Sequence, residues 1–581
     1  MPLGLIDLQG QSSLVLCFDP DLEPIPVKNP GPLALASDRP VALPAAPACV
    51  VPLRQLSLRR DVPRLRALRP EQVVVHTTRN MDPRAILAAV RAGGRWFHLV
   101  DGRGSSFAVN ARGALALAAR LRLRKALARL PGAEVVGELL GVQVHPLWPC
   151  VGATVQLARL AIDRAGSRPP PPSASGPLRV THYVGHLGPG GAERQLVYLA
   201  RATRERGHAV EVLTTQALER DDAHYVEALA GAGIPARWTG WYDSRTLPAV
   251  LRRSPATALF SPGEQRRLLE HVHAENLLPL LEQLLAAPPD VLHCWLDQSN
   301  CLGAVTGLLA GVPRILVSTR NVNPEHFPRF CHPWFKETYR ALADSPRVIF
   351  VANSVAGADD YAAWSGVPRE RFHVVWNGFD AAALEPVPAA QRPARRRELG
   401  LDPQAFLVAG VFRLAPEKRP LEFLEVVARL RARHPGLQVA HVGVGELEPE
   451  VRAAIARLGL QDTVRLLGRL DDPWRVLGVC DASLLCSESE GCPNVSLESQ
   501  ALGVPVVLTR AGGAGETVDE GRTGYACPVG DVEALSARLL ELARDPTRRA
   551  AMGQAGPAWI AERFSMPSMV EAHLRLYGVA P

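Results

Sequence analysis

Hydrophobic and polar positions form two repeating patterns along the chain after residue 177. Short apolar runs, typical of strands buried on both faces, alternate with longer stretches in which apolar residues recur at helical spacing. The runs predicted as strands are LRVTHYV, HAVEVLTT, VLHCWL, RILVST, VIFVAN and HVVWN, followed by FLVAGVF, LQVAHVG, VRLLG, ASLLC and PVVLT. We therefore expect an α/β protein with two doubly wound parallel sheets. The turn signal Asn377-Gly378 marks the crossing between them.

Shifts in composition divide the chain into smaller parts. The segment SRPPPPSASGP is rich in proline, and such sequences form stiff, extended linkers. Before it, QVVVHTT and RWFHLVDGRGSSFAVN predict strands, and residues 82–92 predict a helix. The predicted parts are an extended or poorly ordered segment (1–70), a small basic α/β module (71–166), the linker (167–177), two Rossmann-like domains (178–378 and 379–560) and a C-terminal helix that packs back on the first domain (561–581).

The composition is that of a globular protein without a membrane span. The chain has 581 residues, of which 47% are hydrophobic and 21% charged, so several domains are expected. The first residues lack the basic region of a signal peptide, and no uninterrupted apolar run reaches the length of a spanning helix. The cysteines are spread singly, with no cluster at metal-binding spacing. We expect a cytoplasmic protein with free thiols and no bound metal.

Positive charge is concentrated in the N-terminal third. Residues 1–176 contain 22 Lys and Arg against 12 Asp and Glu, whereas the remainder has a net charge of −3. A predicted helix over residues 111–130 flanks a leucine stripe with arginines. Such a helix can lie on an anionic membrane surface at the inner membrane face, or it can pack on its own module with its arginines extended into water. We expect no nucleic acid partner, because aromatic residues do not interleave with the basic ones.

The most informative stretch is VCDASLLCSESEGCPNVSLESQALGVPVV, residues 479–507. The pattern predicts a buried strand, a polar loop with Glu490, a helix that begins beside Pro493 and contains Glu498, a stop at Gly503 and a second strand. Open α/β sheets bind ligands at the carboxyl ends of their strands, and a helix N-terminus offers free N–H groups to an anion. An ionised carboxylate only accepts hydrogen bonds, so the two glutamates suit sugar hydroxyls.

The spacing of Glu490 and Glu498, with seven residues between them, resembles the E-x7-E motif of retaining glycosyltransferases of family 4. The resemblance extends over residues 178–577. It implies the GT-B fold, in which two Rossmann-like domains face each other, the first on the acceptor side and the second on the donor side. It also implies that Glu490 holds the transferred sugar and that Glu498 binds the ribose hydroxyls of the donor.

A second match lies in FLVAGVFRLAPEKRP, which places Arg413 just after a strand and Lys418 at the head of the next helix. Two cations at one strand end suit a diphosphate, since arginine offers a forked contact and lysine a point charge. The pair resembles the R-x-x-x-x-K element of family 4, which neutralises the nucleotide diphosphate without a metal. By this resemblance Glu490, Arg413 and Lys418 are the catalytic residues, and the only co-substrate is a nucleoside diphosphate sugar.

Glycine-rich loops complete the expected donor site. The loop GHLGPGGAERQ opens a helix, and backbone without side chains can approach a ligand closely. The resemblance implies further donor-binding residues in loops that follow predicted strands and at the helix start before Glu498, namely Gly190, Gly191, Gly443, Gly445, Leu467, Gly468, Asn494 and Val495. It also matches Gly512, Gly513 and Glu516 to the next loop of the family.

The first domain departs from the family pattern. Many members have D-x-x-H-x-H where this chain has DVLHCW, so Trp295 occupies the place of the second histidine. Members that act in surface-polysaccharide assembly are similar in having tryptophan there, followed by an asparagine such as Asn300. With Arg320 and Asn321 after the next strand, these residues form the candidate acceptor cleft. We interpret His293 as a core histidine that closes a strand.

Together these observations predict a retaining glycosyltransferase that moves a sugar from a UDP- or GDP-sugar to an acceptor hydroxyl. The expected acceptor is a saccharide or a lipid-linked saccharide, in polysaccharide, lipopolysaccharide or other glycoconjugate biosynthesis. Two alternatives stay open: a sugar-nucleotide synthase or phosphorylase acting on a soluble acceptor, and a non-catalytic protein that binds sugar nucleotides. An NAD-dependent enzyme is disfavoured, because the dinucleotide fingerprint is missing.

Overall fold

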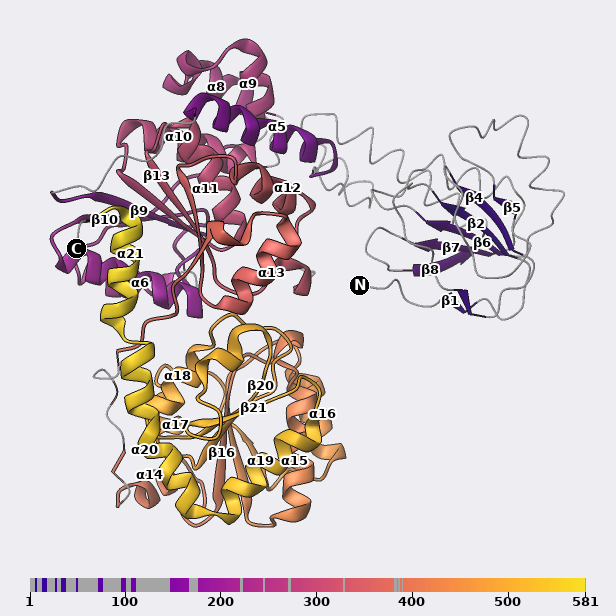
Figure 1. Ribbon diagram of the computed structural model, residues 1–581, viewed down its shortest axis with the longest axis vertical. Coiled ribbons are helices and arrows are strands. Elements are labelled where there is room, and N and C mark those ends of the chain that lie inside the picture. The colour runs from indigo at the N-terminus through magenta and orange to yellow at the C-terminus, as the bar shows by residue number, and fades with distance from the viewer. Residues whose placement is uncertain are drawn as a thin grey trace. The chain divides into compact units, whose positions relative to one another are not determined.

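The computed structural model describes residues 147–579, except for 167–175, 220–222, 244–245, 270–272, 328–329, 381–383, 385–386 and 389, together with the backbone of eight strands before residue 147. The chain divides into two compact units, Met1–Pro149 and Cys150–Pro581. The first unit contains one larger sheet, and the second contains two (Figure 1).

The larger sheet of the first unit has six strands in the order β5-β4-β2-β6-β7-β8. They are β2 (Ser13–Cys17), β4 (Leu33–Ser37), β5 (Cys49–Val50), β6 (Gln72–His76), β7 (Trp96–Val100) and β8 (Ser106–Asn110); β1 (Ile6–Asp7) pairs separately with β3 (Val27–Lys28). Neighbours are parallel except for the antiparallel pair β7 and β8. The strands predicted in QVVVHTT and RWFHLVDGRGSSFAVN are confirmed.

This sheet corrects the boundary predicted at residue 70. Strands β2, β4 and β5 precede that boundary, yet β2 pairs directly with both β4 and β6. The runs SLVLC and LALAS are short and lie between proline-containing segments, so their pattern did not stand out as strands. The helices predicted over residues 82–92 and 111–130 lie outside the described residues.

The second unit begins with a seven-stranded parallel sheet in the order β11-β10-β9-β12-β13-β14-β15. Its strands are β9 (Arg179–Val184), β10 (Ala209–Thr214), β11 (Ala236–Trp238), β12 (Val291–Trp295), β13 (Arg314–Thr319), β14 (Val348–Ala352) and β15 (Phe372–Val374). All the strands predicted for this sheet are present. The three-residue β11 was missed because so short a run carries no clear periodicity.

Helices lie on both sides of this sheet (Figure 1). They are α6 (Gly191–Glu205), α7 (Val226–Ala230), α8 (Leu247–Arg253), α9 (Pro262–Leu269), α10 (Ala274–Ala286), α11 (Asp297–Leu309), α12 (Pro333–Leu342) and α13 (Val355–Ser365). Helix α6 shows how the sequence places them: Leu196, Leu199 and Ala200 recur at helical spacing and share one core cluster with Val180 and Val184 of β9.

Helix α5 (Leu147–Ala165) belongs to the second unit almost entirely, which corrects the module boundary predicted at residue 166. Its buried stripe consists of Leu157, Ala158, Ala161 and Ala165. At its end, the guanidinium of Arg164 lies 4.8 Å from the ring centre of Phe260 and 3.3 Å from the carboxylate of Glu264 in α9. The helix before the predicted linker is thus held by the domain that follows, and residues 167–175 of that linker lie outside the described residues.

The last part of the second unit contains a six-stranded parallel sheet in the order β18-β17-β16-β19-β20-β21. Its strands are β16 (Phe406–Val411), β17 (Leu437–Val442), β18 (Val464–Leu466), β19 (Ala482–Leu485), β20 (Val506–Thr509) and β21 (Gly524–Cys527). Its helices are α14 (Arg392–Glu398), α15 (Pro420–Arg433), α16 (Glu448–Arg457), α17 (Trp474–Leu477), α18 (Asn494–Ala501), α19 (Val532–Arg544) and α20 (Pro546–Arg563). The predicted strands are confirmed, and β21 was missed because it begins with a glycine.

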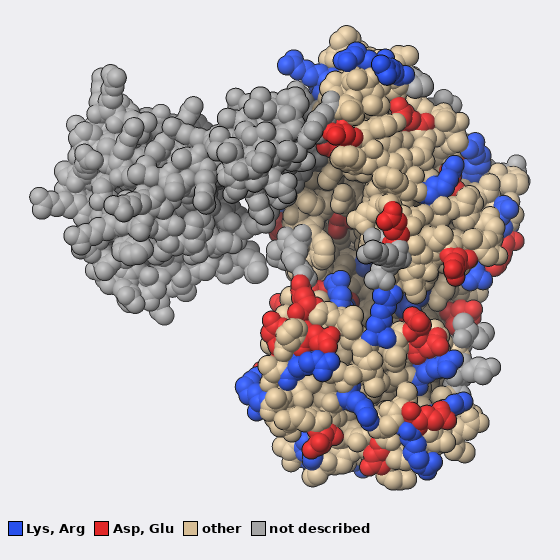
Figure 2. Space-filling view, turned by 180° about the vertical axis from the view of Figure 1, so that it is seen from behind, with Lys and Arg blue, Asp and Glu red and all other residues tan. Residues whose placement is uncertain are grey.

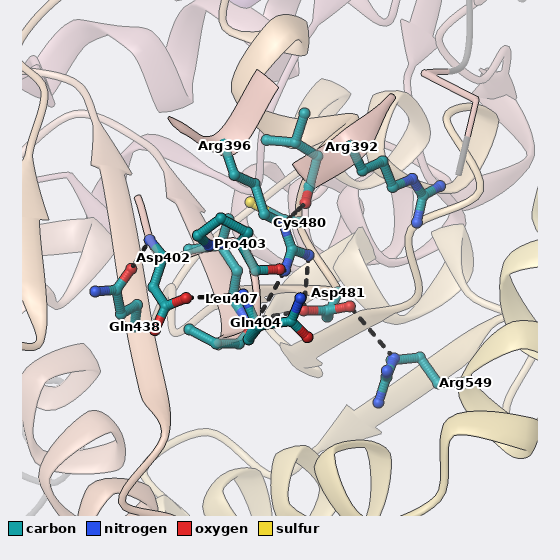
Figure 3. Close-up of polar contacts among 12 residues, drawn as sticks. Arg392, Arg396, Asp402, Pro403, Gln404, Leu407, Gln438, Cys480, Asp481 and Arg549 are labelled. Atoms are coloured by element: carbon teal, nitrogen blue, oxygen red, sulfur yellow. Dashed lines mark hydrogen bonds and ion pairs between the residues drawn. The ribbon is translucent and has the colours of Figure 1, made fainter. Parts of the chain in front are cut away.

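A buried charge network supports this second domain at the amino end of β19 (Figure 3). Asp481 accepts hydrogen bonds from Arg396 Nη2 and from the backbone N–H of Leu407, both at 2.9 Å. Arg549 Nε lies 3.5 Å from the other carboxylate oxygen, and Arg396 also donates to the carbonyl oxygen of Ala405 at 3.0 Å. The network links α14, β16, β19 and α20 at the amino ends of the strands, so it stabilises the scaffold away from the ligand-binding edge.

The two sheets share one topology, and it locates a ligand site in each. Strand β9 lies between β10 and β12, and β16 lies between β17 and β19, so the winding of each sheet reverses beside these strands. In open α/β sheets, ligands bind outside the carboxyl ends of the strands at such a reversal. The loops that follow β9, β12, β16 and β19 are therefore the places where a site is expected.

The chain ends by returning to the first Rossmann-like domain. Helix α21 (Met566–Tyr577) contributes Met569, Val570, Leu574 and Tyr577 to the core cluster that contains Trp295 of β12. The two crossings between the domains lie side by side, since Phe379 forms a bridge with Ser565 and donates its N–H to the carbonyl oxygen of Phe564 at 2.8 Å. The C-terminal helix thus belongs structurally to the first domain.

Candidate active site

Lys418 and Glu490 form an ion pair at the carboxyl ends of β16 and β19. Lys418 ends a short 3-10 helix, Pro416–Lys418, and its ammonium group contacts Glu490 Oε1. The same oxygen accepts a hydrogen bond from Ser487 Oγ at 2.7 Å. The lysine side chain is 23% exposed and that of the glutamate 7% exposed. The carboxylate is therefore held from two sides, while its cation remains within reach of a ligand.

The Glu490 loop is fixed by glycines on the neighbouring loop after β20. Gly512 has φ +51, and a Cβ there would collide with the carbonyl oxygen of Glu490. The N–H of Gly513 donates to that same carbonyl oxygen at 3.0 Å. Glu516 extends from this loop to the other domain, where it accepts hydrogen bonds from the backbone N–H groups of Val355 and Ala356 at 2.9 and 2.8 Å. It therefore caps the start of α13.

Glu498 points from α18 toward the first domain and pairs with Arg194. The contact joins Glu498 Oε1 to Arg194 Nη2, on the first turn of α6. Glu498 is buried, and the arginine side chain is 23% exposed. The carboxylate expected to bind a ribose is thus already neutralised by a residue that the sequence did not single out.

The N-termini of α6 and α18 meet at this point. Asn494, the first residue of α18, donates from Nδ2 to the carbonyl oxygen of Gly191 at 3.3 Å. Gln195 donates to Asn494 Oδ1 at 3.2 Å and to the carbonyl oxygen of Gly378 at 3.0 Å. Neither N-cap residue caps its helix with a side chain, but the buried carboxylate of Glu193 lies against Gly190 at the start of α6 and accepts a hydrogen bond from its own backbone N–H. Of the two helix starts, that of α18 therefore keeps its backbone N–H groups available to an anion. Val495 follows Asn494 in the same first turn.

The glycines after β17 bring two backbone segments close together. Gly443 has φ +138, and its N–H donates to the carbonyl oxygen of Gly468 at 2.8 Å. A Cβ on Gly445 would collide with the carbonyl oxygen of Leu414, just beyond β16. The backbone N–H of Leu467 donates to the carbonyl oxygen of His441 at 2.8 Å. The loops expected to contact the nucleotide therefore lie next to the strand that leads to Lys418.

Arg413 has a different environment from Lys418. Its side chain is 57% exposed, and Nη2 donates to Glu417 Oε1 at 2.6 Å. Burial acts to raise the pKa of Glu417, but hydrogen bonding to Arg413 and the charges of both cations hold it below its usual value. Arg413 is thus available at the surface beside the strand end, with its charge already balanced by a nearby carboxylate.

Two residues of the predicted acceptor cleft lie inside the first domain. Trp295 is fully buried, donates from Nε1 to His182 Nδ1 at 3.1 Å, and stacks on His293 with 4.5 Å between ring centres. Asn300 is also buried, where it donates to the carbonyl oxygen of Ser318 at 2.9 Å and to the hydroxyl of Tyr339 at 3.0 Å. In this conformation both stabilise the interior, and a role toward an acceptor stays a prediction.

Arg320 and Asn321 directly follow β13, next to the Glu490 loop. Burial lowers the pKa of Arg320 to about 10, and the guanidinium lies 5.0 Å from the ring centre of Trp295. Arg320 donates to Asn377 Oδ1, and Asn377 in turn donates to the carbonyl oxygen of Cys492 at 2.8 Å. Asn321 is half-buried, and its Oδ1 accepts from the N–H of Val322 at 2.9 Å. Arg320 therefore supports the loop before α18 through Asn377.

His293 has the surroundings expected of a core histidine. Its ring nitrogens lie 2.8 Å from the hydroxyl of Tyr577 and 2.7 Å from that of Ser318. Burial, together with His182, His573 and Arg320 nearby, holds the pKa of His293 well below its usual value. The imidazole is neutral and enclosed, so it has no path to a substrate in this conformation.

Three residues that position the site were missed from the sequence: Arg194, Gln195 and Asn377. Arg194 and Gln195 are the last two residues of the glycine-rich stretch quoted above, so their place at a helix start was the available signal. Charged side chains of both signs reach the hollow between the two lobes of the second unit (Figure 2). Among the described residues, no group of His, Cys, Asp and Glu is arranged to hold a metal, and no helix there is long and apolar enough to cross a membrane.

The fold and these charged residues define the class of the protein. Residues 189–383 match the family model described as Glycosyltransferase Family 4, and residues 391–559 match the model described as Glycosyl transferases group 1. The two matches cover the two Rossmann-like domains in turn. The chain belongs to the group 1 glycosyltransferases and is an enzyme with the GT-B fold. The predicted family, fold and enzyme class are confirmed.

The names of similar proteins refer to polysaccharide biosynthesis or to sugar transfer. The chain is 29% identical to the Vi polysaccharide biosynthesis protein VipC/TviE of Salmonella typhi, a match that covers 69% of this chain and 72% of that protein. It is 28% identical to a D-inositol 3-phosphate glycosyltransferase of Segniliparus rotundus, with 68% and 86% covered. A GDP-mannose-dependent monoacylated alpha-(1-6)-phosphatidylinositol monomannoside mannosyltransferase of Corynebacterium glutamicum is 33% identical over 34% of this chain and 53% of that protein, about half its length.

Solved structures share the fold of the second unit. Alr3699/HepE of Anabaena in complex with UDP gives a TM-score of 0.56 at 21% identity, covering 68% of this chain and 99% of that one. A glycosyltransferase from Rickettsia africae gives 0.56 at 17% identity, with 69% and 98% covered. Both family models begin after residue 188, so they leave the role of the first unit open.

Proposed function

We propose that the protein is a retaining glycosyltransferase that transfers a sugar from a nucleoside diphosphate donor to a saccharide in the biosynthesis of a surface polysaccharide. The observation that carries the proposal is the Lys418–Glu490 pair, which lies at the carboxyl ends of β16 and β19 in the same domain as Glu498. The similarity to a Vi polysaccharide biosynthesis protein over most of the second unit supports the polysaccharide assignment.

In the proposed donor complex, each charged group meets the part of the donor that suits it. Glu498 accepts hydrogen bonds from the ribose hydroxyls, and the N-terminus of α18 faces the diphosphate. Lys418 and Arg413 neutralise the diphosphate, while Glu490 faces the transferred sugar. The glycines beside β16 leave room for the nucleotide against the backbone.

The chemistry requires no nucleophile from the protein. The bond between the anomeric carbon and the β-phosphate oxygen breaks, and the acceptor oxygen forms the new bond on the same face of the sugar. The acceptor proton passes to the leaving phosphate. Positive charge grows on the sugar ring near Glu490 and negative charge on the diphosphate near Lys418, so fixed charges lower the barrier.

The Lys418–Glu490 pair prepares these two charges before the donor arrives. Each group balances the other in the empty site, and the bound donor places a cationic sugar ring and an anionic diphosphate between them in the transition state. Lys418 lies in a short 3-10 helix and Glu490 in a loop held by Ser487 and Gly513, both just beyond strand ends, so little reorganisation is needed once the donor has separated the pair.

The base and the sugar of the donor are the next questions. One relative is GDP-mannose-dependent, and one structural neighbour is a complex with UDP, so both UDP- and GDP-sugars are candidates. We propose a saccharide or lipid-linked saccharide as the acceptor.

A panel of nucleotides tests the proposal directly. UDP, GDP, ADP and their sugar conjugates are added to the wild type, to Lys418→Ala and to Arg201→Ala, and melting temperatures are recorded. A ligand that binds only the folded protein raises the melting temperature. We expect a shift for one base that is lost in Lys418→Ala and kept in Arg201→Ala. A well-folded wild type that responds to no nucleotide would overturn the proposed function.

Product analysis separates a transferase from the synthase and phosphorylase alternatives. The sugar nucleotide identified above is incubated with lipid-linked oligosaccharides, with free monosaccharides or with phosphate. Elongation of the oligosaccharide with the anomeric configuration of the donor, seen by NMR, supports a retaining transferase. Transfer to free sugars or phosphate alone would favour the alternatives.

We also propose that the basic N-terminal third places the enzyme on an anionic membrane surface, from the net charge of residues 1–176. The full-length protein is mixed with vesicles of neutral lipid or of neutral lipid containing phosphatidylglycerol, at low and high salt. Binding to anionic vesicles that falls with salt supports the proposal. Equal binding to both kinds of vesicle contradicts it.

A further inference from the structure

The ion pair between Arg194 and Glu498 connects the two domains at the donor site. Arg194 lies on the first turn of α6, where its N–H donates to the carbonyl oxygen of Gly190 at 3.1 Å. Its guanidinium contacts a glutamate 304 positions later in the chain. Burial acts to lower the pKa of Arg194, but Glu498, Tyr198 and Tyr225 raise it. The guanidinium is therefore always charged and needs an anionic partner.

This pairing has to adjust when a ribose binds. A carboxylate that holds two neighbouring ribose hydroxyls uses both of its oxygens, so a ribose hydroxyl either shares Glu498 Oε1 with Arg194 or displaces it. A carboxylate oxygen has room for two donors, as Glu490 Oε1 shows, but a second donor weakens the attraction between Glu498 and the guanidinium. A largely buried cation that loses its partner is strongly destabilised unless another anion replaces it.

The donor itself carries that second anion. The diphosphate is attached to the ribose at its 5′ position, on the far side of the same ring from the hydroxyls. Arg194 stands on the first turn of α6, next to the start of α18, whose first turn receives no side-chain cap and so favours an anion. A planar guanidinium also matches two phosphate oxygens better than it matches one shared carboxylate oxygen.

We propose that Arg194 exchanges partners on donor binding: it holds Glu498 in the empty enzyme and the diphosphate of the donor in the complex. The inference rests on the proposed function and adds to it a donor-binding residue from the acceptor-side domain. One consequence is that a nucleoside without phosphates must compete with Arg194 and offers it no anion in exchange. The empty enzyme therefore discriminates against unphosphorylated nucleosides.

Calorimetric titration tests this exchange with the nucleoside, the monophosphate and the diphosphate of the base that stabilises the wild type. In Arg194→Ala we expect the diphosphate to bind at least tenfold more weakly, while the nucleoside binds as well as before or more tightly. Arg194→Lys keeps a cation, so its affinity for the diphosphate should lie between those of the wild type and of Arg194→Ala. Arg201→Ala is the matched control, because this exposed arginine lies two turns further along α6. It is expected to behave as the wild type.

A purely structural ion pair would give a different pattern. If Arg194→Ala weakens the nucleoside and the diphosphate by the same factor, or weakens neither, the exchange is wrong. Glu498→Gln supplies the contrast, because loss of the ribose contact should weaken both ligands together. Should Arg194→Ala fail to fold, Arg194→Gln and Arg194→Lys give the same comparison. A wild type that binds no nucleotide overturns the proposed function itself, whereas a nucleotide-binding wild type with an insensitive Arg194→Ala overturns only the exchange.

Discussion

The two Rossmann-like domains use the same strand-to-helix turn in opposite ways. After β19, Glu490 is held by Ser487 and balanced by Lys418, a partly exposed cation. After β12, the equivalent turn carries Asp297, whose Oδ1 accepts hydrogen bonds from the hydroxyls of Tyr339 and Tyr361 at 2.8 and 2.7 Å. One carboxylate faces a charge that a ligand can displace, and the other is enclosed by neutral groups.

The difference concerns whether a turn at a favourable place in the sheet also has a partner that a ligand can displace. The topology places both turns at a reversal of the sheet, where ligands commonly bind. Burial raises the pKa of Asp297, although the two tyrosine hydroxyls oppose that shift. Its partners Tyr339 and Tyr361 are buried, so in this structure the Asp297 carboxylate contributes to the interior of the domain. Topology indicates where a site can form, and the displaceable partner is the feature from which we infer that it forms after β19.

The sharpest test of this comparison is Glu490→Gln, which changes the charge but hardly the shape. Glutamine can still accept the hydrogen bond from Ser487, so we expect a folded protein. Loss of one preorganised charge in such a site costs about 10² to 10³ in rate, and we expect kcat/KM to fall by that factor. Steady-state assays on protein with an unchanged melting temperature measure it. Near wild-type turnover would remove Glu490 from the chemistry.

Acidification should affect the first domain through its buried histidines. Burial lowers the pKa of His182 and of His573 to about 3, with His573 adding to the effect on His182 and Arg320 to that on His573. Both are neutral when folded, whereas the unfolded chain takes up protons below its pKa of about 6.5. Stability is therefore full above pH 6.5 and is lost as the pH falls toward 3, by about 2 kcal/mol for each histidine at pH 5.

Urea titrations at pH 7.5 and 5.0, followed by tryptophan fluorescence, measure this loss. His573→Gln should reduce the difference between the two pH values by about 2 kcal/mol, because that proton uptake is removed. An unfolding free energy that is equal at both pH values would show that these histidines are protonated in the folded protein.

Arg413→Ala should have a smaller effect than the Glu490 change. Its guanidinium is more than half exposed and already paired with Glu417, so water weakens its attraction for a diphosphate. We expect about a tenfold loss in kcat/KM, roughly 1.4 kcal/mol, with most of it in KM. Lys418→Ala is the comparison variant. Equal losses for both cations would show that exposure in the empty enzyme does not reflect their roles in the complex.

Asp297→Asn is the matched change in the first domain and should have the smallest effect. The amide oxygen still accepts from Tyr339 and Tyr361, and no charge has to be buried, so the unfolding free energy should change by less than about 1 kcal/mol. Turnover per folded molecule should equal that of the wild type. A rate loss like that of Glu490→Gln would mean that both turns take part in catalysis.

Local pattern was sufficient to predict the strands of both sheets except β11 and β21, and to place Lys418 and Glu490 each just beyond the carboxyl end of a strand. These features follow from apolar periodicity and from residue spacing within one domain. The ion pair between Arg413 and Glu417 could also be predicted from local sequence, because the two residues are four positions apart.

The other features of the site depend on contacts between residues that are far apart in the sequence, which a local pattern cannot predict. Arg194 meets Glu498 only because two separately folded domains bring α6 and α18 together. Trp295 ends a strand, and a residue there can face a cleft or the core; it is buried because α21 returns from the far end of the chain to cover it. The family pattern placed Trp295 in the candidate cleft, and its burial under α21 could not be predicted because that helix is remote in sequence.

The side-by-side crossings near Phe379 and Ser565 have a mechanical consequence. Two covalent connections at one place act like a hinge with a single axis, so we expect any opening of the domains to be a rotation about that line and not a sliding motion. Such an opening would move α18 away from α6 and bring it back to the same position. A cut in the chain after residue 563 would leave only one connection, and the domains could then rotate about more than one axis.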